Sequence, residues 1–515
     1  MATRDPASEP LEPSALWTAT DRGTAYPALD HDLETDVAIV GGGIVGLTAA
    51  RLLSEAGLDV TVLEARRVGR QVTGRSTAKV TSQHALKYHD LRTAYGAEAA
   101  RLYADANQEA VRAIERWSPD LDAHFEPRTA YVYTTDQGKL PALHQEVDAA
   151  TEAGLPARFT SDVPLPDAAV GAVAFDAQGQ FDPYAYTSGL ARRVVEGGGH
   201  VFEDTRIERI EEGEPCVVGT DHSTSAQHTV TARKVILATH LPIMDRGLYF
   251  ARTKPRAHAV IAALLDGPPL DGMFISADSP TRSLRSFEDE RGAWLVFLGA
   301  SYTPGAGTDT AAMFEEMEAE VRGRFPVRSV EYRWTNEDYD SVDGLPMVGP
   351  LLPTSKHISI ATGFSAWGIT NGHVAGQILA DAILEQPRSG IAELFDPGRL
   401  HLKEAAGKTV EEVIESATGL ASRYAPGRLL DVATVRPGEA AVGEVNGERA
   451  AVSRDEDGTL HVVSAICTHM GCLLGWNSAM RTWDCRCHGS SFSRDGAVLH
   501  GPAVAPLERI EVDER

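Results

Sequence analysis

The sequence DVAIVGGGIVGLTAARLLSEAGLDVTVLE, residues 36–64, predicts a strand, a helix and a second strand in close succession. Its first five residues form a short apolar run with the β-branching of a buried parallel strand, and VTVL near its end forms another. Between the two runs, Leu47, Ala50 and Leu53 recur at helical spacing. This succession of elements is typical of an α/β fold with a parallel sheet.

Three glycines lie where the first predicted strand turns into the helix. Gly41 permits the tight turn, Gly43 lets the backbone approach a pyrophosphate, and Gly46 lets the helix pack closely on the strand. The N-terminus of the helix then faces the anion. Glu64 ends the second strand, where a carboxylate accepts hydrogen bonds from a ribose hydroxyl pair. The pattern predicts a dinucleotide-binding site.

The length and charge of the chain exclude several classes of protein. Its 515 residues exceed what one hydrophobic core holds, so two or three folded units are expected. The formal net charge of −25 repels phosphate backbones and anionic bilayers, so we expect no nucleic acid as a partner. No apolar run reaches the roughly 18 residues of a membrane span, and the first residues lack a secretory pattern. We therefore expect a cytoplasmic protein with no membrane span.

The pattern of elements along the chain predicts its division into regions. One long helix is expected at Leu91–Trp117, and a strand followed by a helix at 358–384. Further strands are expected at Tyr131–Tyr133, Val235–Ala238, Ala259–Leu264 and Ala293–Leu298. From Leu429 onward, short strands and turns give an all-β signature. We divide the chain into an irregular lead-in (1–32), a nucleotide-binding region (33–390) with a substrate subdomain at about 130–331, a connector with a helix near Val410–Leu420 (391–425), and a small all-β domain (426–515).

A second set of motifs lies away from the three glycines. Asp343-Gly344-Leu345-Pro346 precedes a strand and the segment Gly363–Thr370, and Thr73-Gly74-Arg75-Ser76 follows the second strand. Over roughly residues 34–390 these motifs resemble the glycine/D-amino-acid oxidase family. The resemblance implies FAD, held in an α/β (Rossmann-like) domain with an inserted α+β substrate domain. The FAD-contacting residues that it implies are Gly41, Gly43, Gly46, Glu64, Thr73, Gly74, Arg75, Ser76, Asp343, Gly344, Gly363, Phe364, Gly368 and Thr370.

The chain departs from that family at two points. Sarcosine-oxidase-like members carry a basic residue that grips the substrate carboxylate, and this chain has Thr370 in that place. Lys254, Arg256 or Arg285 can supply the missing charge. No cysteine precedes the DGLP motif, so we expect FAD without a covalent link at that point.

Three side chains near the expected flavin are candidate catalytic residues. Lys79 and His84 lie just beyond the TGRS loop, and Trp367 lies between two of the expected flavin contacts. Lys79 and His84 are expected to orient a substrate or accept its proton.

Four of the five cysteines lie close together near the C-terminus. Cys467-Thr468-His469 and Cys485-Arg486-Cys487-His488 each combine cysteine with histidine, and such crowding predicts a metal site rather than a disulfide scaffold. Tetrahedral zinc also takes two cysteines and two histidines, but finger-type zinc sites pair Cys with Cys and His with His. The arrangement resembles the Rieske pattern, in which two cysteines hold one iron of a [2Fe–2S] cluster and two histidines hold the other.

The Rieske resemblance implies a role for each of these side chains. The implied ligands are Cys467, His469, Cys485 and His488. Cys472 and Cys487 occupy the positions that form a disulfide in respiratory-type Rieske proteins. Phe492 stands where high-potential members use a tyrosine that bonds a cysteine sulfur. With one donor lost, we expect a potential below the top of the Rieske range of roughly −150 to +300 mV.

Together the two resemblances imply an FAD-dependent dehydrogenase that oxidises a small amine or amino-acid-like substrate. FAD takes two electrons as hydride, whereas the cluster passes one electron at a time. We therefore expect electrons to leave singly, through His469 and His488, to an unknown one-electron acceptor outside the chain.

Three other functions stay open at this point. An NAD(P)H-dependent reductase would need a second nucleotide motif, and none is visible. A Rieske oxygenase needs a mononuclear iron held by two histidines and a carboxylate. His84 and His89 give the histidine spacing, but Thr81 stands where the helper acid is usual. The third is a non-catalytic redox or electron-transfer protein, against which the inserted domain argues.

Overall fold

The segment 36–64 forms the predicted β-α-β unit at the centre of a largely parallel sheet. The computed structural model describes residues 15–19, 25–166, 168–220, 227–399 and 427–512. Strand β1 (Leu33–Val40) pairs in parallel with β2 (Val60–Leu63) and with β10 (Thr229–Leu237). Helix α2 (Ile44–Glu55) connects β1 to β2. The predicted Rossmann-like unit is confirmed.

The first sheet has eight strands, six on its main path and two, β8 and β9, beside it. Its main path runs β16-β17-β10-β1-β2-β7, and β9 joins β8 to β10. Its remaining strands are β7 (His200–Phe202), β8 (Ile207–Glu211), β9 (Cys216–Thr220), β16 (Met347–Pro350) and β17 (Ile358–Thr362). Residues 37–40 of β1 and all four residues of β2 are buried on both faces, which explains why these stretches are almost entirely apolar.

The second sheet has nine strands and forms the inserted α+β part. Its main path is β15-β11-β14-β13-β12-β4-β6-β3, and β5 pairs with β6. The strands are β3 (Lys79–Val80), β4 (Glu126–Thr134), β5 (Ala157–Thr160), β6 (Gly171–Gln180), β11 (Thr253–Leu265), β12 (Met273–Ser276), β13 (Ser283–Asp289), β14 (Gly292–Tyr302) and β15 (Val327–Ser341).

The range 130–331, expected as one substrate subdomain, is divided between the two sheets. Strands β4 to β6 and β11 to β15 belong to the second sheet, whereas β7 to β10 belong to the first. The strand expected at Val235–Ala238 is the end of β10, and it pairs with β1. Within this range the chain therefore leaves the second sheet, adds four strands to the first sheet, and then returns to the second.

The helix expected at Leu91–Trp117 is two helices. The first is α3 (Lys87–Tyr95) and the second α4 (Ala97–Trp117), with Gly96 between them at φ +88° and ψ 167°. That conformation is open to glycine and ends the first helix. The other helices are α1 (Leu16–Ala19), α5 (Leu140–Glu152), α6 (Pro183–Glu196), α7 (Thr310–Arg324), α8 (Thr370–Ile383) and α9 (Gly390–Leu394).

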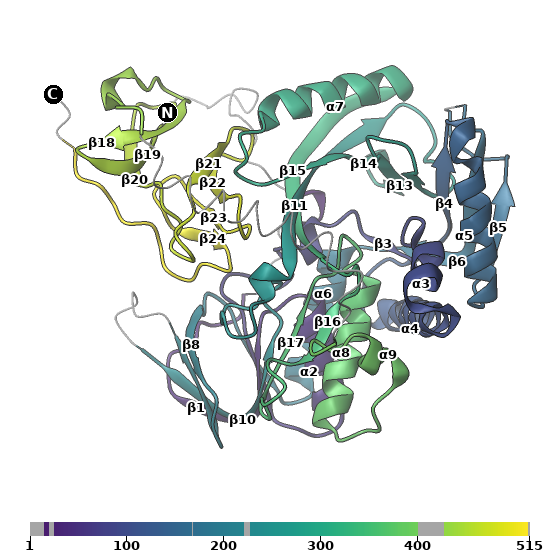
Figure 1. Cartoon of the computed structure of the whole chain (residues 1–515), viewed down its shortest axis with the longest axis horizontal. Coiled ribbons are helices and arrows are strands. Elements are labelled where there is room, and N and C mark those ends of the chain that lie inside the picture. The colour runs from purple at the N-terminus through teal and green to yellow at the C-terminus, as the bar shows by residue number, and fades with distance from the viewer. Residues whose placement is uncertain (1–14, 20–24, 167, 221–226, 400–426, 513–515) are drawn as a thin grey trace.

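The C-terminal part is all-β, as predicted. It contains a three-stranded sheet, β18 to β20, and a four-stranded sheet, β21 to β24, and Figure 1 shows the four-stranded sheet between the three-stranded one and the strands β11 and β15. Its strands are β18 (Ala440–Val445), β19 (Glu448–Arg454), β20 (Leu460–Ser464), β21 (Leu474–Asn477), β22 (Thr482–Cys485), β23 (Ser491–Phe492) and β24 (Val498–His500). The helix expected near Val410–Leu420 lies outside the described residues. Within the described ranges, no helix has the length and apolar character needed to cross a bilayer.

His373 on α8 should make stability depend on pH. Burial lowers its pKa to about 4, and its ring packs against Trp117 with centroids 4.9 Å apart. The unfolded chain, with a histidine pKa of about 6.5, binds more protons than the folded one between these values, so stability falls as the pH drops from 6.5 to 4. We expect His373→Leu to remove about 2–3 kcal/mol of that loss by pH 4.5. Chemical denaturation at pH 6.5 and 4.5 measures it, with the exposed His144→Gln as control. An unchanged acid sensitivity in His373→Leu would contradict the assignment.

Candidate redox site

One cavity of about 290 Å³ joins the three parts of the molecule. Residues 41–45 line it from the first sheet, and strands β11 to β15 line it from the second. Residues 499–501 and 503–504 of the C-terminal part line it as well. A group bound here would therefore contact all three parts.

The glycines of the first turn shape the nucleotide end of the cavity. Gly41 has φ +113°, and a Cβ there would lie 2.4 Å from the carbonyl oxygen of Ala238. A Cβ on Gly46 would lie 2.1 Å from the carbonyl oxygen of Gly41, so the close helix–strand contact requires glycine. Gly43 precedes α2 and lines the cavity, so the N-terminus of α2 faces the cavity, where its backbone N–H groups favour an anionic group.

Glu64 lies at the end of β2, inside the cavity. One carboxylate oxygen accepts a hydrogen bond from the backbone N–H of Gly42 at 2.8 Å, and the other accepts one from Arg66 N–H at 2.9 Å. Burial raises the pKa of Glu64 despite these two bonds. The buried carboxyl, the glycine turn and the helix terminus are the features that a dinucleotide with a ribose diol needs.

His84 and Trp367 also line the cavity and contact each other. Their rings stack with centroids 4.7 Å apart. His84 Nδ1 is hydrogen-bonded to Tyr103 Oη at 2.6 Å, and Nε2 lies 3.0 Å from Thr370 Oγ1 and 2.9 Å from the carbonyl oxygen of Thr81. Burial lowers the pKa of His84 to about 3, so the ring is neutral at neutral pH. Both ring nitrogens are engaged, which leaves neither for a mononuclear iron.

Lys79 lies on the wall that the second sheet contributes. Its Nζ donates to the carbonyl oxygen of Phe274 at 2.5 Å and to Ser283 Oγ at 2.6 Å. Burial, with a smaller contribution from Arg285, lowers the pKa of Lys79 well below its usual value. On the same wall, both ring nitrogens of His258 are buried without a hydrogen-bond partner among the described residues.

The structure brings most of the predicted FAD contacts and catalytic candidates to the cavity. Those lining it are Gly41, Gly43, Glu64, Thr73, Arg75, Ser76, Lys79, His84, Phe364, Trp367, Gly368 and Thr370. The predicted residues outside the lining are Gly46, Gly74, Asp343, Gly344 and Gly363. Asp343 instead forms a buried ion pair with Arg399 at 2.7 Å. Neither Lys254, Arg256 nor Arg285 lines the cavity.

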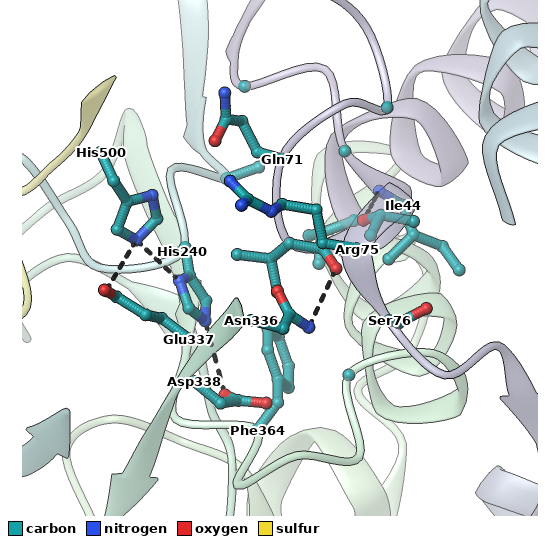
Figure 2. A pocket seen from close by; sticks show the side chains of 18 of the residues that line it. Ile44, Gln71, Arg75, Ser76, His240, Asn336, Glu337, Asp338, Phe364 and His500 are labelled. Carbon is teal, nitrogen blue, oxygen red and sulfur yellow. Dashed lines mark hydrogen bonds and ion pairs between the residues drawn. The ribbon is translucent and has the colours of Figure 1, made fainter. Parts of the chain in front are cut away.

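A group of titratable residues in the cavity wall was not predicted. Figure 2 shows four of them joined in a row, in the order Glu337, His500, His240 and Asp338. His240 Nδ1 lies 3.3 Å from His500 Nε2, and His240 Nε2 lies 3.4 Å from Asp338 Oδ1. Burial, and secondly His240, lowers the pKa of His500 to about 3. No local sequence pattern joins residues 240 and 500, because only the docking of the C-terminal part brings them together.

The Cys/His pairs near the C-terminus converge on a second site. Cys467 and Cys485 are both buried, and a hydrogen bond from the Cys485 thiol lowers the pKa of Cys467. The imidazoles of His469 and His488 lie 5.0 Å apart, and the Nδ1 atom of each is buried without a partner among the described residues. Two thiols and two available ring nitrogens are the donor set of a [2Fe–2S] cluster of the Rieske type, and they fit it.

A disulfide lies beside these cysteine and histidine side chains. Cys472 and Cys487 are joined, with a Cα–Cα distance of 6.5 Å. Their sulfur atoms and that of Cys485 lie within 4.8 Å of one another. The disulfide thus joins the two loops that carry the Cys/His pairs.

Comparison with known proteins identifies the two main parts of the chain. The model of the FAD dependent oxidoreductase (DAO) family matches residues 36–382.

The chain belongs to the FAD dependent oxidoreductase family.

The model of the Rieske [2Fe-2S] domain matches residues 426–511. This member of the oxidoreductase family therefore binds both FAD and a [2Fe–2S] cluster.

Several known proteins resemble this oxidoreductase. YhfW of Bacillus subtilis (strain 168), named as a Rieske 2Fe-2S iron-sulfur protein, is 33% identical over 97% of this chain and 98% of its own. The gamma-glutamylputrescine oxidoreductase of Escherichia coli (strain K12) is 26% identical over 72% of this chain and 87% of its own. Among solved structures, L-proline dehydrogenase from P. horikoshii shares the fold, with a TM-score of 0.60 and 19% identity over 73% of this chain and 99% of that one.

Proposed function

We propose that this protein is an FAD-dependent dehydrogenase of a small amine or amino-acid-like substrate, and that it passes the electrons singly through its Rieske domain to an external acceptor. The cavity supports this proposal most directly, because the second sheet, the dinucleotide turn and residues 499–501 and 503–504 of the Rieske domain meet there. When bound, FAD accepts a hydride equivalent and the cluster exchanges single electrons. The relatives named for gamma-glutamylputrescine and L-proline support the amine class. The cytoplasm stays a prediction of the sequence.

The wall formed by the second sheet provides the groups that would handle the substrate. Burial lowers the pKa of Lys79 well below its usual value, so its amine loses a proton more easily than a free lysine and is suited to exchange a proton with a substrate ammonium group. Ser283 holds the Lys79 Nζ in place, and His258 has two ring nitrogens available for a ligand. His84 stacks on Trp367 and stays neutral, so it fixes the shape of the site without adding charge.

Lys79→Met should slow flavin reduction about tenfold with FAD content unchanged. A tenfold change corresponds to about 1.4 kcal/mol, the order of one lost hydrogen-bonding or proton-transfer interaction. Anaerobic stopped-flow spectroscopy at 450 nm, a wavelength where oxidised flavins absorb, measures the rate. Arg256→Gln removes a half-exposed cation of the same sheet that does not line the cavity, and serves as the control. Equal rates in wild type and Lys79→Met would exclude a catalytic role for Lys79.

An anaerobic substrate screen tests the proposed function as a whole. The holoenzyme is mixed separately with a panel of amines, amino acids, NADH and NADPH, while flavin absorbance and the Rieske EPR signal are followed. We expect an amine or amino acid to bleach the flavin first and the signal of the reduced cluster to appear afterwards. Bleaching by NAD(P)H alone would overturn the dehydrogenase proposal in favour of a reductase.

A further inference from the structure

One segment of the flavin domain connects the cavity to the cluster ligands. Residues 239–252 leave β10 and lead to β11, and Thr239, His240 and Ile243 of this segment line the cavity. Two residues further, Asp245 contacts a cluster ligand, and Phe250 contacts the rings of both histidine ligands. We call residues 239–252 the bridging segment.

The bridging segment covers the edge of the cluster site that the two histidines form. The Oδ1 atom of Asp245 lies 2.7 Å from Nε2 of His469, whose side chain is only 6% exposed. The ring of Phe250 meets His469 and His488 edge-on, with centroids 5.9 and 5.0 Å apart. Because Nε2 of His469 is engaged by Asp245, Nδ1 is the nitrogen available to iron.

The backbone of the second histidine ligand is also attached to the flavin domain. Tyr339 on β15 donates from its hydroxyl to the carbonyl oxygen of His488 at 2.9 Å. The ring of Tyr339 packs on His240, with centroids 4.6 Å apart. Both histidine ligands therefore contact the flavin domain, rather than forming an open surface for an external protein.

We propose that Asp245 is a positioning residue for the cluster: it holds Nε2–H of His469 and keeps the histidine edge of the Rieske domain against the flavin domain. The histidine edge then serves electron exchange with the flavin, and the external acceptor reaches the cluster from another side. This inference rests on the proposed electron route but not on the identity of the substrate. It replaces the expectation that His469 and His488 form the exit from the protein.

The charge of Asp245 gives the proposal a measurable consequence. Reduction adds a negative charge to the cluster, and a carboxylate hydrogen-bonded to a ligand opposes that charge. Asp245 therefore lowers the midpoint potential. Asp245→Asn keeps the shape and the acceptor oxygen but removes the charge, so it should raise the potential.

The test is a redox titration of the holoenzyme with dye mediators, in which EPR follows the reduced cluster. For Asp245→Asn we expect the reduced-to-oxidised ratio at a fixed potential to increase at least tenfold, which is 59 mV for a one-electron couple. Asp271→Asn removes the same charge from an exposed residue before β12 and should change the ratio less than twofold. Asp245→Glu restores the carboxylate and should return the potential toward the wild-type value.

A second measurement examines the docking itself. After anaerobic photoreduction of the flavin, electrons should equilibrate with the cluster at least tenfold more slowly in Asp245→Ala, which lacks both the charge and the acceptor. The proposal would be overturned if the reduced-to-oxidised ratio of Asp245→Asn at a fixed potential stayed within twofold of the wild-type ratio. It would also be overturned if the rate of equilibration in Asp245→Ala were unchanged. Neither measurement needs a substrate, so a failed amine screen would leave this inference standing.

Discussion

Replacing Cys485 by serine should remove the [2Fe–2S] cluster and leave FAD bound. Cys485 is 1% exposed, at the end of β22, and its sulfur lies beside the disulfide rather than in solvent. A serine hydroxyl at this position is a poor replacement for the thiolate that iron requires. We expect the iron content and the Rieske EPR signal to fall to background, and the flavin absorbance per chain to stay at the wild-type level.

Cys216 provides the matched control for this change. It is also buried, at the start of β9, and its thiol donates to the carbonyl oxygen of Gly213 at 3.5 Å. Burial raises its pKa, which is the property of an inert thiol rather than of a ligand. Cys216→Ser should therefore keep the full cluster signal. A Cys485→Ser protein with wild-type iron content would refute the ligand set.

Gly46→Val should yield a protein that is purified almost without FAD. A Cβ at this position would already lie 2.1 Å from the carbonyl oxygen of Gly41 and 3.1 Å from Cγ2 of Ile39. Relief of that overlap must move α2 away from the turn, at a cost of about 3 kcal/mol. If the same displacement weakens binding, the FAD dissociation constant rises by roughly 100-fold. The flavin-to-protein absorbance ratio and reconstitution of the deflavinated chain with FAD measure the loss.

The control for Gly46 is Gly323 on α7. A Cβ there meets nothing within 4 Å and the backbone is helical, so Gly323→Ala should raise stability by about 0.5–1 kcal/mol. FAD content should stay unchanged in that variant. Full FAD occupancy in Gly46→Val would show that the turn does not set the flavin site.

The parts of this molecule that were predictable from the sequence are those that short segments specify. Gly46 needs to be glycine because of Gly41 and Ile39, which lie within seven residues of it, and residues 37–40 before the turn form an uninterrupted apolar run. The cysteines and histidines predicted as cluster ligands likewise lie in two short motifs. In such cases the residue type and its spacing already contain the physical constraint.

The contacts between domains could not be predicted in this way. His240 and His500 are 260 residues apart, and Asp245 meets His469 across 224 residues. Neither Asp245 nor His240 belongs to a motif. Asp343 of the DGLP segment was expected to contact the flavin, but its carboxylate forms an ion pair with Arg399. Arg399 lies 56 residues further along the chain, so the local motif did not indicate this partner. Similarly, the pairing of β10 with β1 and of β7 with β2 shows that part of the expected substrate subdomain belongs to the first sheet.

The connectivity of the sheets bears on how such a gene can be recombined. The chain passes repeatedly between the two large sheets, so a DNA exchange with one breakpoint inside 33–390 would mix strands of two parents within a single sheet. The seven strands from β18 to β24 follow one another without leaving the C-terminal part. A single junction before them suffices to append or delete the whole iron–sulfur module. Point substitutions on β11 to β14 would change one wall of the cavity, and exchange of the module would replace residues 499–501 and 503–504 of its lining.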